Sequence, residues 1–213
     1  MFQNKRKLKS LLKEMWECSE CSDSERESEK SYGQINVDLS ETWAKNFKRS
    51  TFLKGPWIFP PYKVQNDKGE MKLVRGFFGK GGDKGIMFIA ERPSTGKFPD
   101  KRCRMFYELL AKNNLHDAHL TDFVKCRGLV REGVKKVKEN CFERILKREI
   151  EIVAPKIVIP IGNEAERLCK QYLVEDILEE KKLKEKIIHY AYRFDSKENV
   201  KKEIQGRLEK FRD

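Results

Sequence analysis

The sequence lacks long apolar runs and has fewer apolar residues than an average globular chain. No stretch approaches the ~18 consecutive apolar residues of a membrane helix, and no small-residue cleavage site of a signal peptide follows the N-terminal segment. Apolar residues make up 38% of the 213 positions, against the usual ~45–50%. The 13 Phe, 6 Tyr and 3 Trp still supply the bulk for one core. These features argue against a membrane protein and a secreted disulfide scaffold, and predict one cytoplasmic domain over residues 1–213.

Acidic residues are outnumbered by basic ones. The 46 Lys and Arg against 34 Asp and Glu leave a formal net charge of +12 and a pI near 9.4. This surplus is typical of proteins that bind nucleic acid through its phosphates. A soluble protein with a lysine-rich surface has the same composition, so charge alone leaves both interpretations open.

Strand-like and helical patterns alternate from residue 85 onward. The patterns predict strands at 86–90, 120–124, 156–161 and 187–190, and helices at 101–111, 140–153, 163–173 and 196–212. Such alternation predicts βαβ units. The expected fold is therefore an α/β/α sandwich around a mainly parallel, four-stranded sheet.

The N-terminal part is less regular. The patterns predict a helix at 5–17, a second helix at about 38–49 and a strand near 71–77, and residues 22–84 contain a predicted insertion or loop region. In parallel sheets, ligands bind beyond the carboxyl ends of the strands. The candidate site residues are therefore those that follow each predicted strand, at 91–100, 122–127, 162–163 and 189–193.

Four of the six cysteines form two spaced pairs. Cys18 and Cys21 are separated by two residues, and Cys126 and Cys141 by fourteen. Four convergent thiolates suit an iron–sulfur cluster or tetrahedral zinc, and ordinary reduced thiols are the alternative.

The other two cysteines lie within predicted helices. Cys103 and Cys169 share helical faces with apolar residues. We therefore predict that both are small apolar core residues.

The order of several motifs resembles that of the iron–sulfur uracil-DNA glycosylases, most closely the thermostable branch called family four. The matching segments are CSEC, IMFIAERP, TDFVKCRG, the later Cys141, APKIVIPIGNEA and HYAYR. The resemblance covers about residues 10–30 and 85–194. It implies a DNA glycosylase that hydrolyses the N-glycosidic bond of a flipped-out uracil or other deaminated or damaged base. We expect it to act on DNA as a monomer.

The resemblance also implies a cofactor. Its cysteine motifs correspond to Cys18, Cys21, Cys126 and Cys141, which would hold a 4Fe-4S cluster, with zinc as the alternative. Such a cluster would hold a basic loop in shape rather than carry electrons. The competing hypothesis is a non-catalytic iron–sulfur protein of the same fold that binds nucleic acid.

Two residues take catalytic roles by resemblance. Glu91 is expected to activate water and stabilise an oxocarbenium-like sugar, and His189 to stabilise the departing base anion. Without the motif order, Glu91 would be interpreted as a solvated carboxylate at a strand end, and His189 as a strand histidine with its hydrogen bonds satisfied.

Other residues are expected to contact DNA. The resemblance places the extruded base against Ala90, Phe98 and Asp122, with Phe98 stacking on it. Phe98 could instead pack on the helix that follows. The residues expected to meet the DNA backbone or the minor groove are Lys125, Arg127, Tyr192 and Arg193, although all four also suit a solvated surface.

The sequence departs from the family pattern at the base-reading position. Asp122 stands where the family has Asn, and an ionised carboxylate only accepts hydrogen bonds. Facing a uracil carbonyl, it would cost about 1–3 kcal/mol, whereas a base with an exocyclic amine suits it. In addition, AERPS lacks the family's flanking glycines, the family's later Gly-Arg-Pro-Phe-Val-Gly stretch survives only as GKFPD, and Tyr190 replaces a Pro. These departures predict a glycosylase with altered base preference.

Overall fold

The computed structural model describes residues 2–18, 59, 61–81, 85–92, 101–125, 134–173 and 182–212. The chain is divided into two compact units. The first contains Met1–Ile58, Arg92–Phe98 and Asp122–Ile152, and the second contains Phe59–Glu91, Pro99–Thr121 and Val153–Asp213. The helix expected at 38–49 lies outside the described residues.

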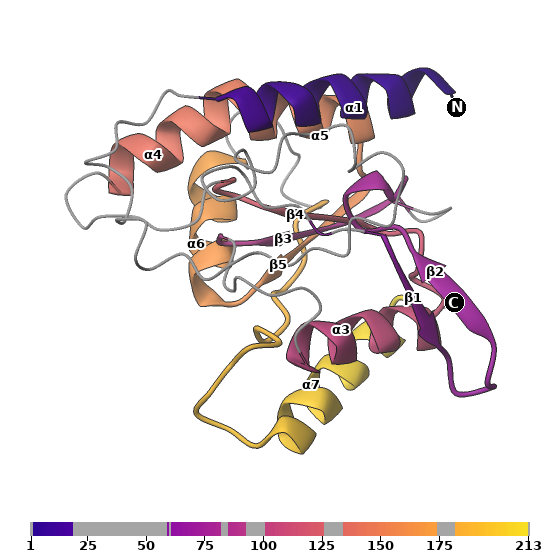
Figure 1. The fold of residues 1–213 in the computed structure, drawn as a ribbon. Coiled ribbons are helices and arrows are strands. Elements are labelled where there is room, and N and C mark those ends of the chain that lie inside the picture. Colours follow the sequence, from indigo (N-terminus) through magenta and orange to yellow (C-terminus); the bar gives the residue numbers. More distant parts are fainter. Residues whose placement is uncertain are drawn as a thin grey trace. The chain divides into compact units, whose positions relative to one another are not determined.

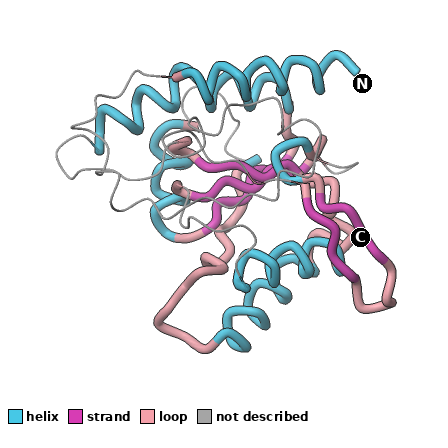
Figure 2. The backbone as a smooth tube through the Cα atoms, viewed as in Figure 1, coloured by secondary structure: helices cyan, strands magenta, loops and turns pink. Residues whose placement is uncertain are grey.

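The central sheet has three strands in the order β4-β3-β5 (Figures 1 and 2). They are β3 (Ile86–Ala90), β4 (His119–Asp122) and β5 (Ile157–Ile161). β3 and β5 pair in parallel, and all five side chains of β3 are fully buried. The short apolar run at 86–90 therefore forms the buried parallel strand that it predicts.

A fourth strand at 187–190 is not confirmed. The segment 183–187 runs parallel to β5 and pairs with it at two isolated bridges, Val158 with Leu183 and Ile161 with Ile187. Beyond Ile187 the chain turns, because the Tyr192 N–H donates to the carbonyl of His189 at 2.8 Å. The backbone at 188–190 is therefore used for a turn rather than for sheet pairing.

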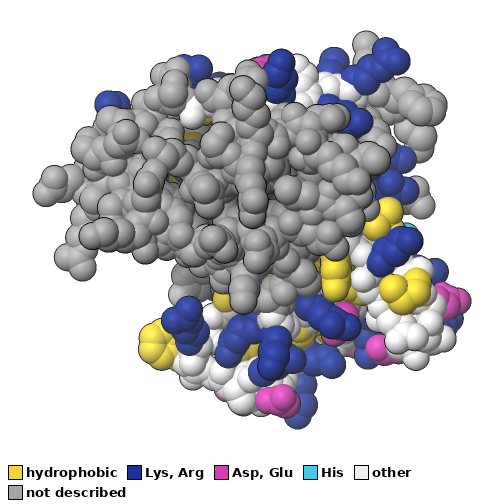
Figure 3. All heavy atoms as spheres, in the orientation of Figure 1, with side chains coloured by type: hydrophobic (Ala, Val, Ile, Leu, Met, Phe, Trp, Pro, Cys, Tyr) yellow, Lys and Arg dark blue, Asp and Glu magenta, His cyan; other side chains and the backbone are white. Residues whose placement is uncertain are grey.

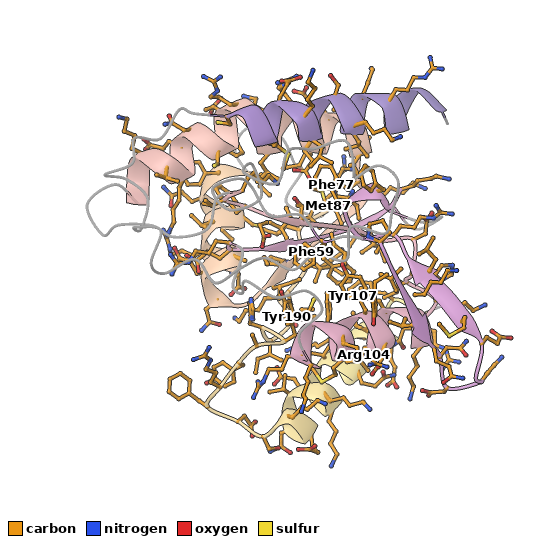
Figure 4. The ribbon with its side chains drawn as sticks, viewed as in Figure 1. Phe59, Phe77, Met87, Arg104, Tyr107 and Tyr190 are labelled. Atoms are coloured by element: carbon orange, nitrogen blue, oxygen red, sulfur yellow. The ribbon has the colours of Figure 1, made fainter. Side chains whose placement is uncertain are left out.

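Three helices belong to the second unit. They are α3 (Lys101–Lys112), α6 (Asn163–Tyr172) and α7 (Lys197–Glu209). α6 packs on β5, and α3 packs against α7. Figure 4 shows Tyr107 and Tyr190 between α3 and the sheet, whereas Arg104 points away from it. These helices agree with the predicted ones within a few residues.

An antiparallel hairpin also belongs to the second unit. β1 (Tyr62–Gln65) pairs with β2 (Met71–Val74), and a 3₁₀ turn, Gly76–Phe78, follows. Tyr62 meets Tyr107 of α3 edge to face, with ring centroids 6.2 Å apart. The strand expected at 71–77 is therefore shorter, and it pairs outside the central sheet.

A long broken helix dominates the described part of the first unit. α4 (Val134–Cys141), a π-helical turn (Phe142–Leu146) and α5 (Lys147–Val153) follow one another directly. Buried residues recur in pairs at every fourth position: Val137/Lys138, Cys141/Phe142, Ile145/Leu146 and Glu149/Ile150. With 3.6 residues per turn, a four-residue repeat drifts by about 40° per step in a regular α-helix. The wider turn absorbs part of this drift and keeps the row facing inward.

The first helix, α1 (Phe2–Glu17), also belongs to this unit. Leu8, Leu11, Leu12 and Met15 form its buried face, as the spacing predicts. Figure 1 shows α1 and the α4–α5 helix running in opposite directions. Among the described residues, no helix has the length and apolar character needed to cross a membrane.

Candidate active site

Residues at the ends of two strands and one bridged segment form a row across the second unit. Ala90 pairs with Ile161, and Ile161 is bridged to Ile187. Glu91 comes one residue after this row and His189 comes two residues after it. Two interstrand spacings of about 4.8 Å separate the outer members of the row, so the backbone positions of Ala90 and Ile187 are about 10 Å apart. The two expected catalytic residues therefore lie on either side of the end of β5.

The hydrogen bonding of His189 sets its tautomer. The backbone N–H of Ala191 donates to Nδ1 of His189 at 3.0 Å. A ring nitrogen that accepts a hydrogen bond carries no proton, so the neutral imidazole holds its proton on Nε2. Nε2–H is therefore the donor group of this ring.

An aromatic stack holds the imidazole from the core side. The His189 ring stacks on Tyr190 at 4.6 Å, and Tyr190 stacks on Phe106 at 5.3 Å. Phe106 in turn meets Phe88 of β3 edge to face at 5.8 Å. On the other side, Gly162 has φ +89°, and a Cβ there would lie 3.3 Å from the Cβ of His189. The position of His189 thus depends on buried rings and on a close glycine.

The segment after His189 is anchored at both ends and exposes a phenyl ring. Arg102 of α3 donates to the carbonyl of Tyr192, and Ser196 caps the N-terminus of α7. Between these anchors, Phe194 is 90% exposed and meets the Tyr192 ring at 5.6 Å. Because both ends of the loop are anchored, the loop can present Phe194 to a ligand at a smaller entropic cost of ordering on binding.

Glu91 is half-buried and lies close enough to α6 to influence the pKa of Arg167. The pKa of Arg167 is raised, mainly by its hydrogen bonds with Glu164 and to a smaller degree by the negative charge of Glu91. A carboxylate at this strand end can also attract a positive charge that develops on a substrate.

A cavity of about 460 Å³ opens beside His189. Gly162 and Tyr192 contribute to its wall, together with several charged side chains. Lys186 pairs there with Glu166 at 2.6 Å. The cavity therefore gives a polar ligand room against one side of the histidine.

The last residue of β4 and the segment that follows it belong to the first unit, where Lys125 forms a buried ion pair with Glu149 of α5. Asp122 is 2% exposed. Nζ of Lys125 donates to the backbone carbonyl of Asp122 at 2.6 Å and to Glu149 at 2.5 Å. Because the Lys125 and Glu149 side chains are only 3% and 0% exposed, the Lys125 ammonium faces the protein interior. This placement does not favour the phosphate contact expected of Lys125.

The described cysteines fall into two groups. Cys18, directly after α1, is half-buried, and Cys141, at the end of α4, is 8% exposed. Their expected partners Cys21 and Cys126 lie outside the described residues. Within the described ranges, which contain only half of the expected ligand set, no group of three or more potential metal ligands occurs.

The other two cysteines are core residues, as predicted. Cys103 is 6% exposed and Cys169 is 0% exposed. Burial, and to a smaller degree the charge of Glu166, raise the pKa of Cys169 to about 12. This thiol therefore stays protonated at neutral pH.

The remaining predicted residues differ in their placement. Ala90 is fully buried, and Tyr192 and Arg193 are exposed. Phe98 and Arg127 lie outside the described residues.

Sequence reasoning missed three residues of these sites. An aromatic residue just beyond a predicted site is the signal that points to Phe194, and an acid next to an apolar residue in a four-residue repeat points to Glu149. Nothing local in the sequence identifies Arg102 as the anchor of a loop that comes about 90 residues later.

The comparison with family profiles agrees with this architecture. A search of curated proteins found no match. The family profile described as the uracil DNA glycosylase superfamily matches residues 78–207. The match includes the three strands of the sheet, Glu91 and His189. Because the match covers more than half of the chain, the protein belongs to the uracil DNA glycosylase superfamily.

Proposed function

We propose that this protein is a DNA glycosylase that removes a deaminated or damaged base flipped out of the duplex. Members of its superfamily are DNA glycosylases in general. The row of sheet ends supports the proposal, because a carboxylate follows β3 and a histidine with an Nε2–H donor follows the segment that is bridged to β5. A DNA substrate also agrees with the cytoplasmic location predicted from the sequence.

The reaction needs two charges to be stabilised. As the bond between C1′ and the base nitrogen breaks, positive charge develops on the sugar and negative charge on the base. Glu91 would face the sugar, orient a water molecule and take its proton as the water oxygen bonds to C1′. Nε2–H of His189 would donate to an oxygen of the departing base anion, which solvent later protonates.

The donor set suits a metal centre. Thiolates are soft ligands that bind iron–sulfur clusters or zinc, and Cys18 and Cys141 are both in the first unit. We propose that these two, with Cys21 and Cys126, hold a 4Fe-4S cluster, with zinc as the alternative. When bound, the group would cross-link segments of this unit and supply no redox step.

The surface of the second unit carries exposed lysines, which favour binding of a polyanion such as DNA. Exposed lysines on α3 and α7 include Lys101, Lys197, Lys201 and Lys202. Figure 3 shows Lys and Arg side chains gathered over the part of the molecule where these helices lie. Because lysines bind phosphates without reading sequence, DNA binding by this surface should weaken steeply as salt rises.

A panel of oligonucleotides tests the proposed activity. Duplexes each containing one uracil, hypoxanthine, xanthine or mismatched base are incubated with the purified protein and then treated with alkali. Strand breaks at the altered base support a glycosylase. Salt-sensitive binding without breaks at any base would instead support the non-catalytic alternative.

The substitution Asp122→Asn is expected to move base preference toward uracil. An amide offers both a donor and an acceptor, whereas the carboxylate of Asp122 only accepts. The difference of about 1–3 kcal/mol corresponds to a roughly 5–150-fold rise in uracil excision relative to excision of an amine-bearing base. Competition assays with both substrates in one reaction measure this ratio. An unchanged ratio would show that Asp122 does not contact the base.

Phe194→Ala is expected to impair excision from double-stranded DNA more than from single strands. An exposed ring that inserts into the base stack replaces the stacking lost when a base flips, and such stacking contributes about 1–3 kcal/mol. The measurement is the ratio of kcat/KM for duplex and single-stranded substrates. Met71→Ala, which removes another exposed apolar side chain from β2, is the control. Equal losses on both substrates would contradict an inserting role.

A further inference from the structure

His189 begins a four-residue turn whose second position is Tyr190. The N–H of Tyr192 donates to the carbonyl of His189 at 2.8 Å and closes the turn, and the N–H of Ala191 donates to Nδ1 of the His189 ring at 3.0 Å. Proline is favoured at the second position of common turns because its ring fixes φ. Tyr190 stands where the family pattern has Pro, so the backbone of this turn does not have that restraint.

The ring of Tyr190 connects the turn to the core of the second unit. Tyr190 is 5% exposed. One stack joins its ring to His189 at 4.6 Å and 28°, and another joins it to Phe106 of α3 at 5.3 Å and 14°. Phe106 and Phe88 meet edge to face at 5.8 Å, and both are fully buried. The imidazole therefore lies at the outer end of a stack whose inner rings are fixed by the core.

Helix α3 holds this turn at two points. Phe106 stacks on the second residue of the turn, and Arg102 donates to the carbonyl of the fourth residue, Tyr192. Residues four apart lie on the same face of a helix. One face of α3 therefore supports both halves of the turn.

Two torsions of His189 are restrained by different contacts. The χ2 torsion of histidine is broad and nearly two-fold, but a flipped ring would place Cδ2 opposite the Ala191 N–H, and carbon does not accept this hydrogen bond. Rotation about χ1 would instead carry the imidazole off the Tyr190 ring. Gly162 closes the Cδ2 side, since a Cβ there would lie 3.6 Å from Cδ2. The hydrogen bond and the stack together give Nε2–H one direction.

We propose that Tyr190 and Phe106 are positioning residues for His189. Both are buried and do not touch the substrate; they hold the imidazole so that Nε2–H already points toward the departing base when the glycosidic bond breaks. The stack supplies the restraint that a proline would give to the backbone of the turn. Each aromatic contact of this kind shifts a conformational equilibrium about 2–10-fold. The inference rests on the catalytic role proposed above for His189.

The substitution Tyr190→Leu tests this role by kinetics. Leucine is apolar but has no ring, so both aromatic contacts are lost. The kcat for base release should fall about 4–100-fold, while the affinity for DNA should stay unchanged. Tyr190→Phe retains the ring and should keep kcat at the wild-type value. Should Tyr190→Leu not fold, Phe106→Leu removes one contact and should lower kcat about 2–10-fold.

Tyr107 supplies the matched control. It follows Phe106 in α3, is fully buried, and meets Tyr62 edge to face at 6.2 Å. Tyr107→Leu thus removes a buried aromatic contact of the same helix, and it should lower stability but leave kcat at the wild-type value. Equal falls in kcat for Tyr107→Leu and Tyr190→Leu would show a general loss of packing and would contradict the positioning role.

A double variant shows whether Tyr190 acts through His189. In the His189→Ala background, Tyr190→Leu should cause no further fall in kcat, because a positioning residue has no effect once the ring that it holds is absent. A further fall as large as that in the wild-type background would overturn the positioning role.

Nitrogen chemical shifts of the three histidines test the same role without a substrate. In the wild type, the His189 signals, assigned by comparison with His189→Ala, should show the Nε2–H tautomer. In Tyr190→Leu the ring should exchange between both tautomers, and its two shifts should move toward each other. Circular dichroism in the far ultraviolet checks that each variant is folded.

The outcomes separate the positioning role from the glycosylase itself. Wild-type His189 shifts, or a wild-type kcat, in folded Tyr190→Leu would overturn the positioning role and leave the proposed activity in place. A wild-type protein that releases no base from the oligonucleotide panel would refute the proposed activity. The shifts of Tyr190→Leu would still decide, in that case, whether the stack holds the ring.

Discussion

Replacing His189 by alanine is expected to lower kcat for base release by about 10²–10³-fold. The Ala191 N–H donates to Nδ1, so the proposed role of the ring in stabilising the departing base falls to Nε2–H, and alanine has no donor to replace it. Because this interaction forms as the bond breaks, DNA binding should change little. Single-turnover kinetics with saturating enzyme, together with equilibrium binding at fixed salt, separate the two effects.

His116 supplies the matched control. It is half-buried in the segment before β4, and His116→Ala should leave kcat at the wild-type value. A His189→Ala protein that is folded and retains full kcat would show that another group stabilises the base anion.

Lys125→Met is expected to lower the free energy of unfolding by about 3–5 kcal/mol. The substitution leaves the carboxylate of Glu149, which is 0% exposed, without its ammonium partner in a region from which water is excluded. Urea unfolding monitored by circular dichroism, on protein of matched metal content, measures the loss.

The double variant Lys125→Met/Glu149→Leu removes both charges. Apolar replacement of a buried ion pair is often neutral or stabilising, so this protein should recover most of the lost stability. An exposed pair is different: Arg104→Met, which disrupts the exposed Arg104–Glu108 pair, should cost no more than about 0.5 kcal/mol. A comparable small loss for Lys125→Met would contradict the buried placement of Lys125.

Local patterns predicted the parts of the fold that depend on local burial. The apolar runs at 86–90 and 157–161 form paired strands because neither face of such a strand tolerates polar residues. Cys103 and Cys169 are buried as their helical faces indicate. The positions of Glu91 and His189 at the end of the sheet follow from the same alternation.

Features that depend on distant segments could not be predicted in this way. The basic character of Lys125 suggested a surface contact, and only Glu149, 24 residues later, explains its burial. The apolar run at 187–190 suggested a strand, but the hydrogen bonds of His189 use that backbone for a turn. The π-helical turn has a signal in the sequence, the recurrence of apolar residues at every fourth position from Val137 to Ile145, which a search for 3.6-residue periodicity passes over.

Release of free base from a duplex carrying one altered base shows whether the protein is a glycosylase. Wild-type protein and the double variant Glu91→Gln/His189→Ala, purified identically, are incubated with the same panel, and released bases are identified by mass spectrometry. We expect release of at least one base by the wild type and none above background by the variant. No release by folded, metal-containing wild type, or equal release by both proteins, would contradict it.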